Sequence, residues 1–251
     1  MIDKNYINGI LKASLNPTTE EIRLIMEKAS KRIKLSHIEI AMLLNAHDEK
    51  QVHSIYDIAG KLKEEIYGNR VVIFAPLYIS NYCVNNCKYC GYRRDNKFAR
   101  RKLTQDEIKE QAINLEKLGH KRLALEVGEA PVETPIDYVV ESIKTIYEHS
   151  SIRRINVNIA ATTVEEYKML HDIGIGTYIL FQETYDKDAF ETNHPKSLKG
   201  DYDYHLYAFD RAFEAGIDDV GACVLFGLAD WKFEVLSLII HNEYLEKKFG
   251  V

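Results

Sequence analysis

The sequence predicts an α/β fold, a partial βα barrel that follows an N-terminal helical segment. After residue 70, short apolar runs alternate with longer amphipathic stretches, and strands that alternate with helices form parallel sheets through right-handed crossovers. The expected strands are Val71–Ile79, Leu123–Val127, Ile155–Ile159, Thr177–Phe181 and Val220–Phe226. We therefore expect two domains, a helical segment over residues 1–69 and an incomplete barrel over residues 70–251.

Helix-capping signals support this order of elements. Ser36 lies three residues before Glu39 and forms a capping box ahead of an apolar run that is typical of a helix. The last N-terminal helical pattern ends at Gly68, which suits a C-terminal cap. Thr104 and Thr163, each with a glutamate three residues later, open the helices that follow the first and third strands.

The composition limits the classes of function. The chain has 251 residues, 46% of them hydrophobic and 28% charged, which is ordinary for a soluble globular protein. The net charge of -5 gives no support to nucleic-acid binding, and we interpret the basic and aromatic stretch Lys88–Lys102 as a solvated loop rather than an RNA contact. The sequence contains neither a long apolar run nor a secretory signal. We expect a cytoplasmic protein with no membrane and no nucleic-acid partner.

Three of the four cysteines lie in one short loop directly after the first strand. Cys83, Cys87 and Cys90 are separated by three residues and then by two. In a reducing compartment such a cluster indicates a metal centre rather than disulfides, and three thiolates leave one iron of an iron–sulfur cluster open for chemistry. The alternative is a structural zinc site with a histidine or Cys223 as the fourth ligand. Zinc sites commonly pair their ligands in two short knuckles, and the chain has no second knuckle. Cys223 lies in an apolar run and is most simply a buried hydrophobic residue.

Polar residues follow the next three expected strands as well. Gly128 and Glu129 end the second strand, Asn158–Ala160 the third, and Gln182 and Glu183 the fourth. The carboxyl ends of parallel strands meet at one rim, which is where βα barrels carry their chemistry. A glycine there lets a ligand approach the backbone, and a carboxylate can accept a hydrogen bond from an ammonium group. The sequence therefore predicts a single site at this rim.

The spacing Cys-x3-Cys-x2-Cys after a strand is the signature of radical S-adenosylmethionine (SAM) enzymes. In these enzymes three thiolates hold three irons of a [4Fe-4S] cluster, and the amino and carboxylate groups of SAM chelate the fourth iron. An electron from the reduced cluster cleaves a carbon–sulfur bond of SAM and yields a 5′-deoxyadenosyl radical. Tyr89 occupies the usual aromatic position, which packs on the adenine.

Longer segments resemble the HydG family, the radical SAM tyrosine lyases of [FeFe]-hydrogenase maturation. These segments are Ala75–Asn81, Cys90–Lys97, Arg153–Asn158, Phe181–Tyr185 and Arg211–Gly221. The related thiamin-pathway tyrosine lyase, ThiH, shares the core but is less similar before the cysteine loop and after it. The resemblance reaches the last residue and implies a TIM-like barrel of the radical SAM type, truncated after its fifth βα unit. HydG has a further C-terminal region with a second iron–sulfur cluster, which this sequence lacks.

The resemblance implies that SAM is cleaved reductively and that L-tyrosine is split into p-cresol and dehydroglycine. It further implies an electron donor such as ferredoxin or flavodoxin, and other hydrogenase maturation proteins or a barrel-completing chain as partners. The residues that it assigns are Cys83, Cys87 and Cys90 for the cluster, Tyr89, Gly128, Glu129 and Asn158 for SAM, and Gln182 and Glu183 for the substrate cavity.

Three positions at the rim depart from the family pattern. Asp186 stands where the family usually has histidine, His205 where it has arginine, and Ala161 where it has proline. An aspartate is a harder, anionic ligand, and a histidine lacks the permanent fork of donors that an arginine offers to carboxylates. Two alternatives therefore stay open. One is a ThiH-like enzyme or a lyase for another aromatic amino acid, and the other is a truncated, non-catalytic fragment that needs a partner.

Overall fold

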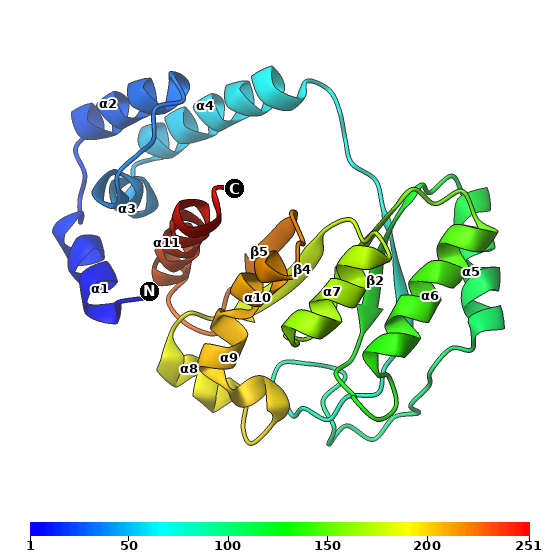
Figure 1. Cartoon of the computed structure of the whole chain (residues 1–251). Coiled ribbons are helices and arrows are strands. Elements are labelled where there is room, and N and C mark those ends of the chain that lie inside the picture. Colours follow the sequence, from blue (N-terminus) through cyan, green and yellow to red (C-terminus); the bar gives the residue numbers. More distant parts are fainter. The chain divides into compact units, whose positions relative to one another are not determined.

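The computed structural model describes residues 1–251 and divides the chain into two compact units (Figure 1). The first unit contains Met1–Val72 and Ala229–Glu243, and the second contains Ile73–Leu228 and Tyr244–Val251. Residues 229–243, expected from the sequence to belong to the barrel, lie in the first unit, and the division into domains at residues 69 and 70 stays a prediction.

The first unit is built on four N-terminal helices, α1 (Lys4–Ala13), α2 (Thr19–Ser30), α3 (His37–Asn45) and α4 (Glu49–Tyr67). Reciprocal capping boxes open α2 at Thr18 and α3 at Ser36, the second as predicted. The predicted glycine cap also forms, because Gly68 has φ of 59° and donates its N–H to the Glu64 carbonyl at 2.8 Å. Ile22, Ile25 and Met26 of α2 form the core of these helices.

The second unit contains a five-stranded parallel sheet of order β1-β2-β3-β4-β5. Its strands are β1 (Ala75–Ser80), β2 (Arg122–Val127), β3 (Arg154–Asn158), β4 (Tyr178–Glu183) and β5 (Val220–Val224). The sheet does not close on itself, so β1 and β5 are its edges. This arrangement confirms the predicted α/β fold with a partial barrel.

Helices follow the strands along the chain. They are α5 (Gln105–Lys117), α6 (Ile136–His149), α7 (Val164–Asp172), α8 (Lys187–Asn193), the short 3₁₀ helix η1 (Leu198–Gly200), α9 (Tyr202–Leu206), α10 (Ala208–Glu214) and α11 (Trp231–Phe249). Thr104 forms the predicted capping box at α5, whereas Thr163 at α7 accepts the Glu166 N–H without the reciprocal bond. No helix of the chain has both the length and the hydropathy that crossing a membrane requires.

The first strand begins four residues later than predicted. Val71–Phe74 is not a strand, and its four apolar side chains are between 53% and 78% exposed. The ladder between β1 and β2 starts at the pair Ala75 and Leu123, one residue after β2 itself begins. The segment before Ala75 therefore has no neighbouring strand to pair with, and a continuous apolar run cannot reveal where that partner starts.

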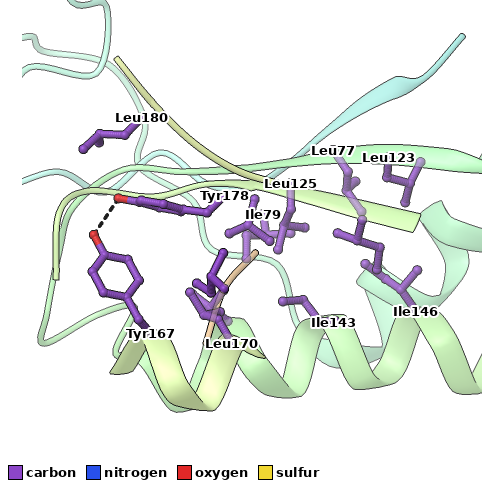
Figure 2. Close-up of a cluster of buried hydrophobic side chains, with 14 of the residues drawn as sticks. Leu77, Ile79, Leu123, Leu125, Ile143, Ile146, Tyr167, Leu170, Tyr178 and Leu180 are labelled. Carbon is purple, nitrogen blue, oxygen red and sulfur yellow. Dashed lines mark hydrogen bonds between the residues drawn. The ribbon is translucent and has the colours of Figure 1, made fainter. Parts of the chain in front are cut away.

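Helices α5, α6, α7 and α10 cover one face of the sheet and bury a single core (Figure 1). Leu77, Leu125 and Ile143 are fully or almost fully buried in this core (Figure 2). Two of its tyrosines pair their hydroxyls, since Tyr167 donates to Tyr178 at 2.8 Å. Because side chains alternate along a strand, the residues between these core positions point to the opposite face. That face carries the cross-strand row Tyr78, Glu126, Asn158, Ile179 and Gly221.

Candidate functional site

The cysteine loop and the carboxyl ends of β2, β3 and β4 enclose a cavity of about 260 Å³. All but one of the site residues predicted from the sequence line this cavity, namely Cys83, Cys87, Cys90, Tyr89, Gly128, Glu129, Asn158 and Glu183. The exception is Gln182, whose side chain is 4% exposed and whose Nε2 is buried without a hydrogen-bond partner. The structure therefore brings residues from four separate segments to one place.

Backbone hydrogen bonds fix the cysteine loop to its neighbours. The Val84 N–H donates to the Glu129 carbonyl at 2.8 Å, and the Gly128 N–H donates to the Ser80 carbonyl at 3.3 Å. Farther along the loop, the Lys88 N–H donates to the Asn193 carbonyl at 3.0 Å. The loop is thus tied both to the end of β2 and to the end of α8.

Gly128 is required by the close approach of the cysteine loop. A Cβ atom at this position would lie 2.3 Å from the Tyr82 carbonyl oxygen and 3.2 Å from the Cys83 Cβ. Real Cβ atoms do not make contacts as short as the first, so only glycine fits without a shift of the loop backbone.

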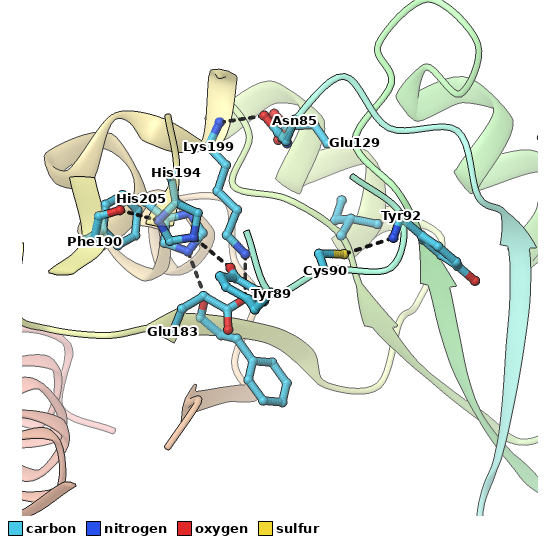
Figure 3. A network of polar contacts seen from close by, with 12 residues as sticks. Asn85, Tyr89, Cys90, Tyr92, Glu129, Glu183, Phe190, His194, Lys199 and His205 are labelled. Atoms are coloured by element: carbon cyan, nitrogen blue, oxygen red, sulfur yellow. Dashed lines mark hydrogen bonds and ion pairs between the residues drawn. The ribbon is translucent and has the colours of Figure 1, made fainter. Parts of the chain in front are cut away.

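The three loop cysteines are free thiols with unequal burial. Cys87 is buried, whereas Cys83 and Cys90 are partly exposed. Burial raises the pKa of the Cys87 thiol to about 11, and the nearby Lys199 ammonium partly offsets this effect. The Sγ of Cys90 accepts a hydrogen bond from the Tyr92 N–H at 3.3 Å (Figure 3). Cys223 is half-buried, not buried as expected, and does not line the cavity.

The donor set fits a cluster better than a single ion. No group of three or more His, Cys, Asp or Glu side chains converges closely enough to hold one metal ion. A zinc ion would need such convergence, because each Zn–S bond is about 2.3 Å long. In a [4Fe-4S] cluster each thiolate binds a different iron, so the thiols can stand farther apart around one cavity.

Lys199 joins the loop to β4 and was not foreseen from the sequence. Its ammonium lies 2.6 Å from a Glu183 carboxylate oxygen, and its backbone N–H donates to Asn85 Oδ1 at 3.1 Å (Figure 3). Asn85 in turn donates its side-chain N–H to the Glu129 carboxylate. Burial raises the pKa of Glu129, and the Asn85 bond and the Lys199 charge work against that rise. A continuous chain of polar contacts therefore links the ends of β2 and β4.

Glu183 reaches this network through an unusual backbone. Its φ of 68° lies in the left-handed region, which costs a residue other than glycine about 1–2 kcal/mol. The ladder between β4 and β5 shifts register between Phe181 and Glu183, so the chain bends where the carboxylate turns toward Lys199. The Glu183 side chain is only 9% exposed.

Tyr89 is held by His194, which lies at the C-terminal end of α8. His194 Nδ1 lies 2.7 Å from the Phe190 carbonyl oxygen, so this nitrogen carries the proton and donates it. His194 Nε2 is then the acceptor for the Tyr89 hydroxyl, also at 2.7 Å (Figure 3). Burial lowers the pKa of His194 to about 4, which keeps the ring neutral at pH 7.

The three departures from the family pattern have ordinary structural positions. Asp186 is the N-cap of α8 and accepts the Ala189 N–H at 3.0 Å. His205 is buried with Nε2 2.8 Å from the Phe181 carbonyl, and burial lowers its pKa to about 3. Neither residue lines the cavity of the cysteine loop, whereas Ala161 lines a second cavity of about 240 Å³ beside it.

The basic stretch after the cysteines is organised by one arginine. The Arg100 guanidinium donates to the carbonyls of Asn81, Tyr92 and Arg93 at 2.6–2.9 Å and lies 4.3 Å from the centre of the Phe98 ring. Arg100 therefore holds the loop in place, whereas the sequence predicted a solvated loop over the whole stretch.

Comparison with known proteins identifies the class. Residues 77–236 match the family model of the Radical SAM superfamily, and the chain belongs to this superfamily. Its structure is similar to a crystal structure of HydG, a maturase of the [FeFe]-hydrogenase, with a TM-score of 0.97 and 54% identity over 100% of this chain and 56% of that chain. HydG from Carboxydothermus hydrogenoformans gives a TM-score of 0.92 and 42% identity over 98% of this chain and 58% of that one.

A curated relative extends the comparison beyond HydG. The 2-iminoacetate synthase of Salmonella typhimurium is 30% identical over 225 residues, which are 89% of this chain and 59% of the relative. The chain thus spans a little more than half the length of the proteins that it matches. The resemblance to HydG inferred from the sequence is confirmed.

Proposed function

We propose that the chain is a radical SAM lyase of the HydG type, which cleaves SAM reductively and splits L-tyrosine into p-cresol and dehydroglycine. One observation carries the proposal: the cysteines of the Cys-x3-Cys-x2-Cys loop line one cavity with the Gly128-Glu129 end of β2. The 54% identity to HydG supports the choice of substrate.

The loop cysteines are suited to hold a [4Fe-4S] cluster. Cys83, Cys87 and Cys90 supply the thiolates, and the Tyr92 N–H donates to the Cys90 sulfur. When bound, the reduced cluster supplies one electron and SAM supplies a 5′-deoxyadenosyl radical. An external one-electron donor such as ferredoxin or flavodoxin is needed to reduce the cluster. Clustered cysteines are typical of metal centres in a reducing compartment, and we place the protein in the cytoplasm.

The residues around the cysteines bind and orient. Glu129 accepts the ammonium of SAM, because its burial favours a cationic partner for the carboxylate. Gly128 lets SAM approach the backbone. Asn158, which the resemblance assigns to SAM, donates instead to Glu126 deeper on β2, so we assign it to the inner part of the cavity. His194 fixes the Tyr89 hydroxyl and so holds the ring that would pack on the adenine of SAM. Glu183 and Gln182 at the end of β4 are assigned to the substrate side of the site.

Anaerobic reconstitution of the chain with iron and sulfide tests this function. Incubation with SAM, dithionite and tyrosine is expected to yield 5′-deoxyadenosine and p-cresol. Cys87→Ala is the matched control, which we expect to lose both products together with the cluster absorbance. A wild-type protein with a full cluster and no 5′-deoxyadenosine would refute the proposal.

A second candidate is a lyase of the same type that acts on another aromatic amino acid. The departures of Asp186, His205 and Ala161 from the family pattern motivate it, and of these Ala161 lines the cavity beside the site. Formation of 5′-deoxyadenosine with tryptophan but not with tyrosine would select this candidate.

A third candidate is a non-catalytic part of an assembly, which works with hydrogenase maturation proteins or with a barrel-completing chain. Co-purification of a second polypeptide would indicate this role.

A further inference from the structure

Glu126 is a carboxyl group in the cavity wall that the proposed function does not use. It stands on β2 in the cross-strand row with Tyr78 and Asn158, and it lines the same cavity as the three cysteines. Its Oε1 accepts a hydrogen bond from Asn158 Nδ2 at 2.5 Å. Burial raises its pKa to about 7, and the Asn158 bond is the one contact that opposes this rise.

The other carboxylates of the cavity are matched by partners, whereas Glu126 has no cation. Glu183 pairs with the Lys199 ammonium at 2.6 Å. Glu129 accepts a hydrogen bond from Asn85, and the positive charge of Lys199 opposes the rise in its pKa. No lysine or arginine pairs with Glu126. A desolvated carboxylate without a counter-charge gains more from a cationic ligand than a paired one does.

The position of Glu126 separates it from the expected SAM site. It precedes Gly128 by two residues, so it lies about 7 Å deeper along the strand direction than the rim glycine. A substrate that enters the same cavity below SAM would reach this level of β2. Asn158 adds an acceptor next to the carboxylate, because its Oδ1 is buried and unpartnered.

We propose that Glu126, together with Asn158, forms the subsite for the primary ammonium group of the amino-acid substrate. An ammonium has three donors, and a carboxylate beside an amide oxygen provides charge-assisted and neutral acceptors for them. The alternative partner is the phenol hydroxyl at the other end of tyrosine, which is neutral and would leave the Glu126 charge uncompensated. The inference rests on the proposed function and adds to it a determinant of specificity for amino acids over deaminated acids.

Glu126→Gln tests the subsite, because the amide keeps an acceptor for Asn158 Nδ2 and removes only the charge. The full chain with its reconstituted cluster is titrated calorimetrically with tyrosine in the presence of SAM and without a reductant. We expect tyrosine to bind the variant at least tenfold more weakly than the wild type. The comparison ligand is 3-(4-hydroxyphenyl)propionate, which lacks the ammonium group and is expected to bind both proteins equally. Should the chain prefer tryptophan, the pair becomes tryptophan and indole-3-propionate.

Two results would overturn the inference. One is equal affinity of the wild type and Glu126→Gln for the amino acid. The other is a weaker affinity of the variant for SAM or for the deaminated acid by the same factor, which would show that Glu126 serves SAM or the aromatic end. Unchanged thermal melting of the variant excludes misfolding as the cause of a weaker affinity. Failure of the wild type to form 5′-deoxyadenosine contradicts the proposed function separately, since these titrations involve no turnover.

Discussion

Replacement of Gly128 by alanine adds one methyl group where the second strand meets the cysteine loop. The new Cβ would lie 2.3 Å from the Tyr82 carbonyl oxygen, which is backbone and cannot rotate away. To reach ordinary contact the Tyr82–Cys83 backbone must retreat by about 1 Å. Overpacking of this kind costs about 1–3 kcal/mol of folding free energy. The displaced segment carries the first cysteine, so we expect iron binding to suffer as well.

The matched control is Gly91→Ala in the same loop. Gly91 has no atom within 4 Å of its would-be Cβ, and neither glycine has a positive φ. Because both substitutions restrict the unfolded chain equally, the difference between the two variants measures the clash alone. Urea unfolding gives the free energies, and iron per chain after anaerobic reconstitution gives the occupancy.

We expect Gly91→Ala to match the wild type in both measurements and Gly128→Ala to lose at least half of its iron. Wild-type stability and iron content in Gly128→Ala would refute the reasoning, because the loop would then not be held against β2 as tightly as the structure indicates.

Two further predictions concern ion pairs. Lys199→Met leaves the Glu183 carboxylate buried and unpaired, and we expect this to lower the free energy of urea unfolding by about 3 kcal/mol. The double variant with Glu183→Gln should recover part of this loss. Additive losses in the two single variants would argue against the pair. The pKa of Glu39 is lowered to about 2, chiefly by a lysine of α2. Its stabilising effect is therefore present above the usual value of 4.5 and is lost as the pH falls towards 2, so Glu39→Gln should flatten the dependence of the melting temperature on pH in that window.

The sequence predicted those parts of the site that depend on local pattern. Strand order follows from the alternation of apolar runs with capped helices. The convergence of Cys83, Gly128 and Asn158 follows from parallel pairing, because all three lie at or just after the carboxyl ends of strands. Lys199 and His194 could not be predicted, because their contacts do not follow from a local sequence pattern. Each stands alone in the loop region after β4, more than 100 residues from the cysteines, and meets them only through tertiary packing.

Asp186 and His205, which depart from the family pattern, show a further limit of prediction from sequence motifs. From the sequence, Asp186 and His205 were weighed as altered ligands of the site. In the structure Asp186 caps a helix, and the His205 ring faces the Phe181 carbonyl in the interior. A cap and a buried hydrogen bond depend on where α8 and α9 begin, and the ends of helices are the least certain part of a structure predicted from sequence.

The backbone of Glu183 gives a last test of how the site is built. A strand that only paired with its neighbour would keep a regular ladder, yet β4 shifts register here and Glu183 adopts φ of 68°. Glycine tolerates this conformation and alanine does not, so we expect Glu183→Gly to be more stable than Glu183→Ala by about 1 kcal/mol. This order reverses the usual preference for alanine over glycine inside secondary structure, while both variants remove the same carboxylate. Urea unfolding of the two variants measures the difference. A more stable alanine variant would mean that the left-handed backbone is not needed, and that the carboxylate reaches Lys199 without strain in β4.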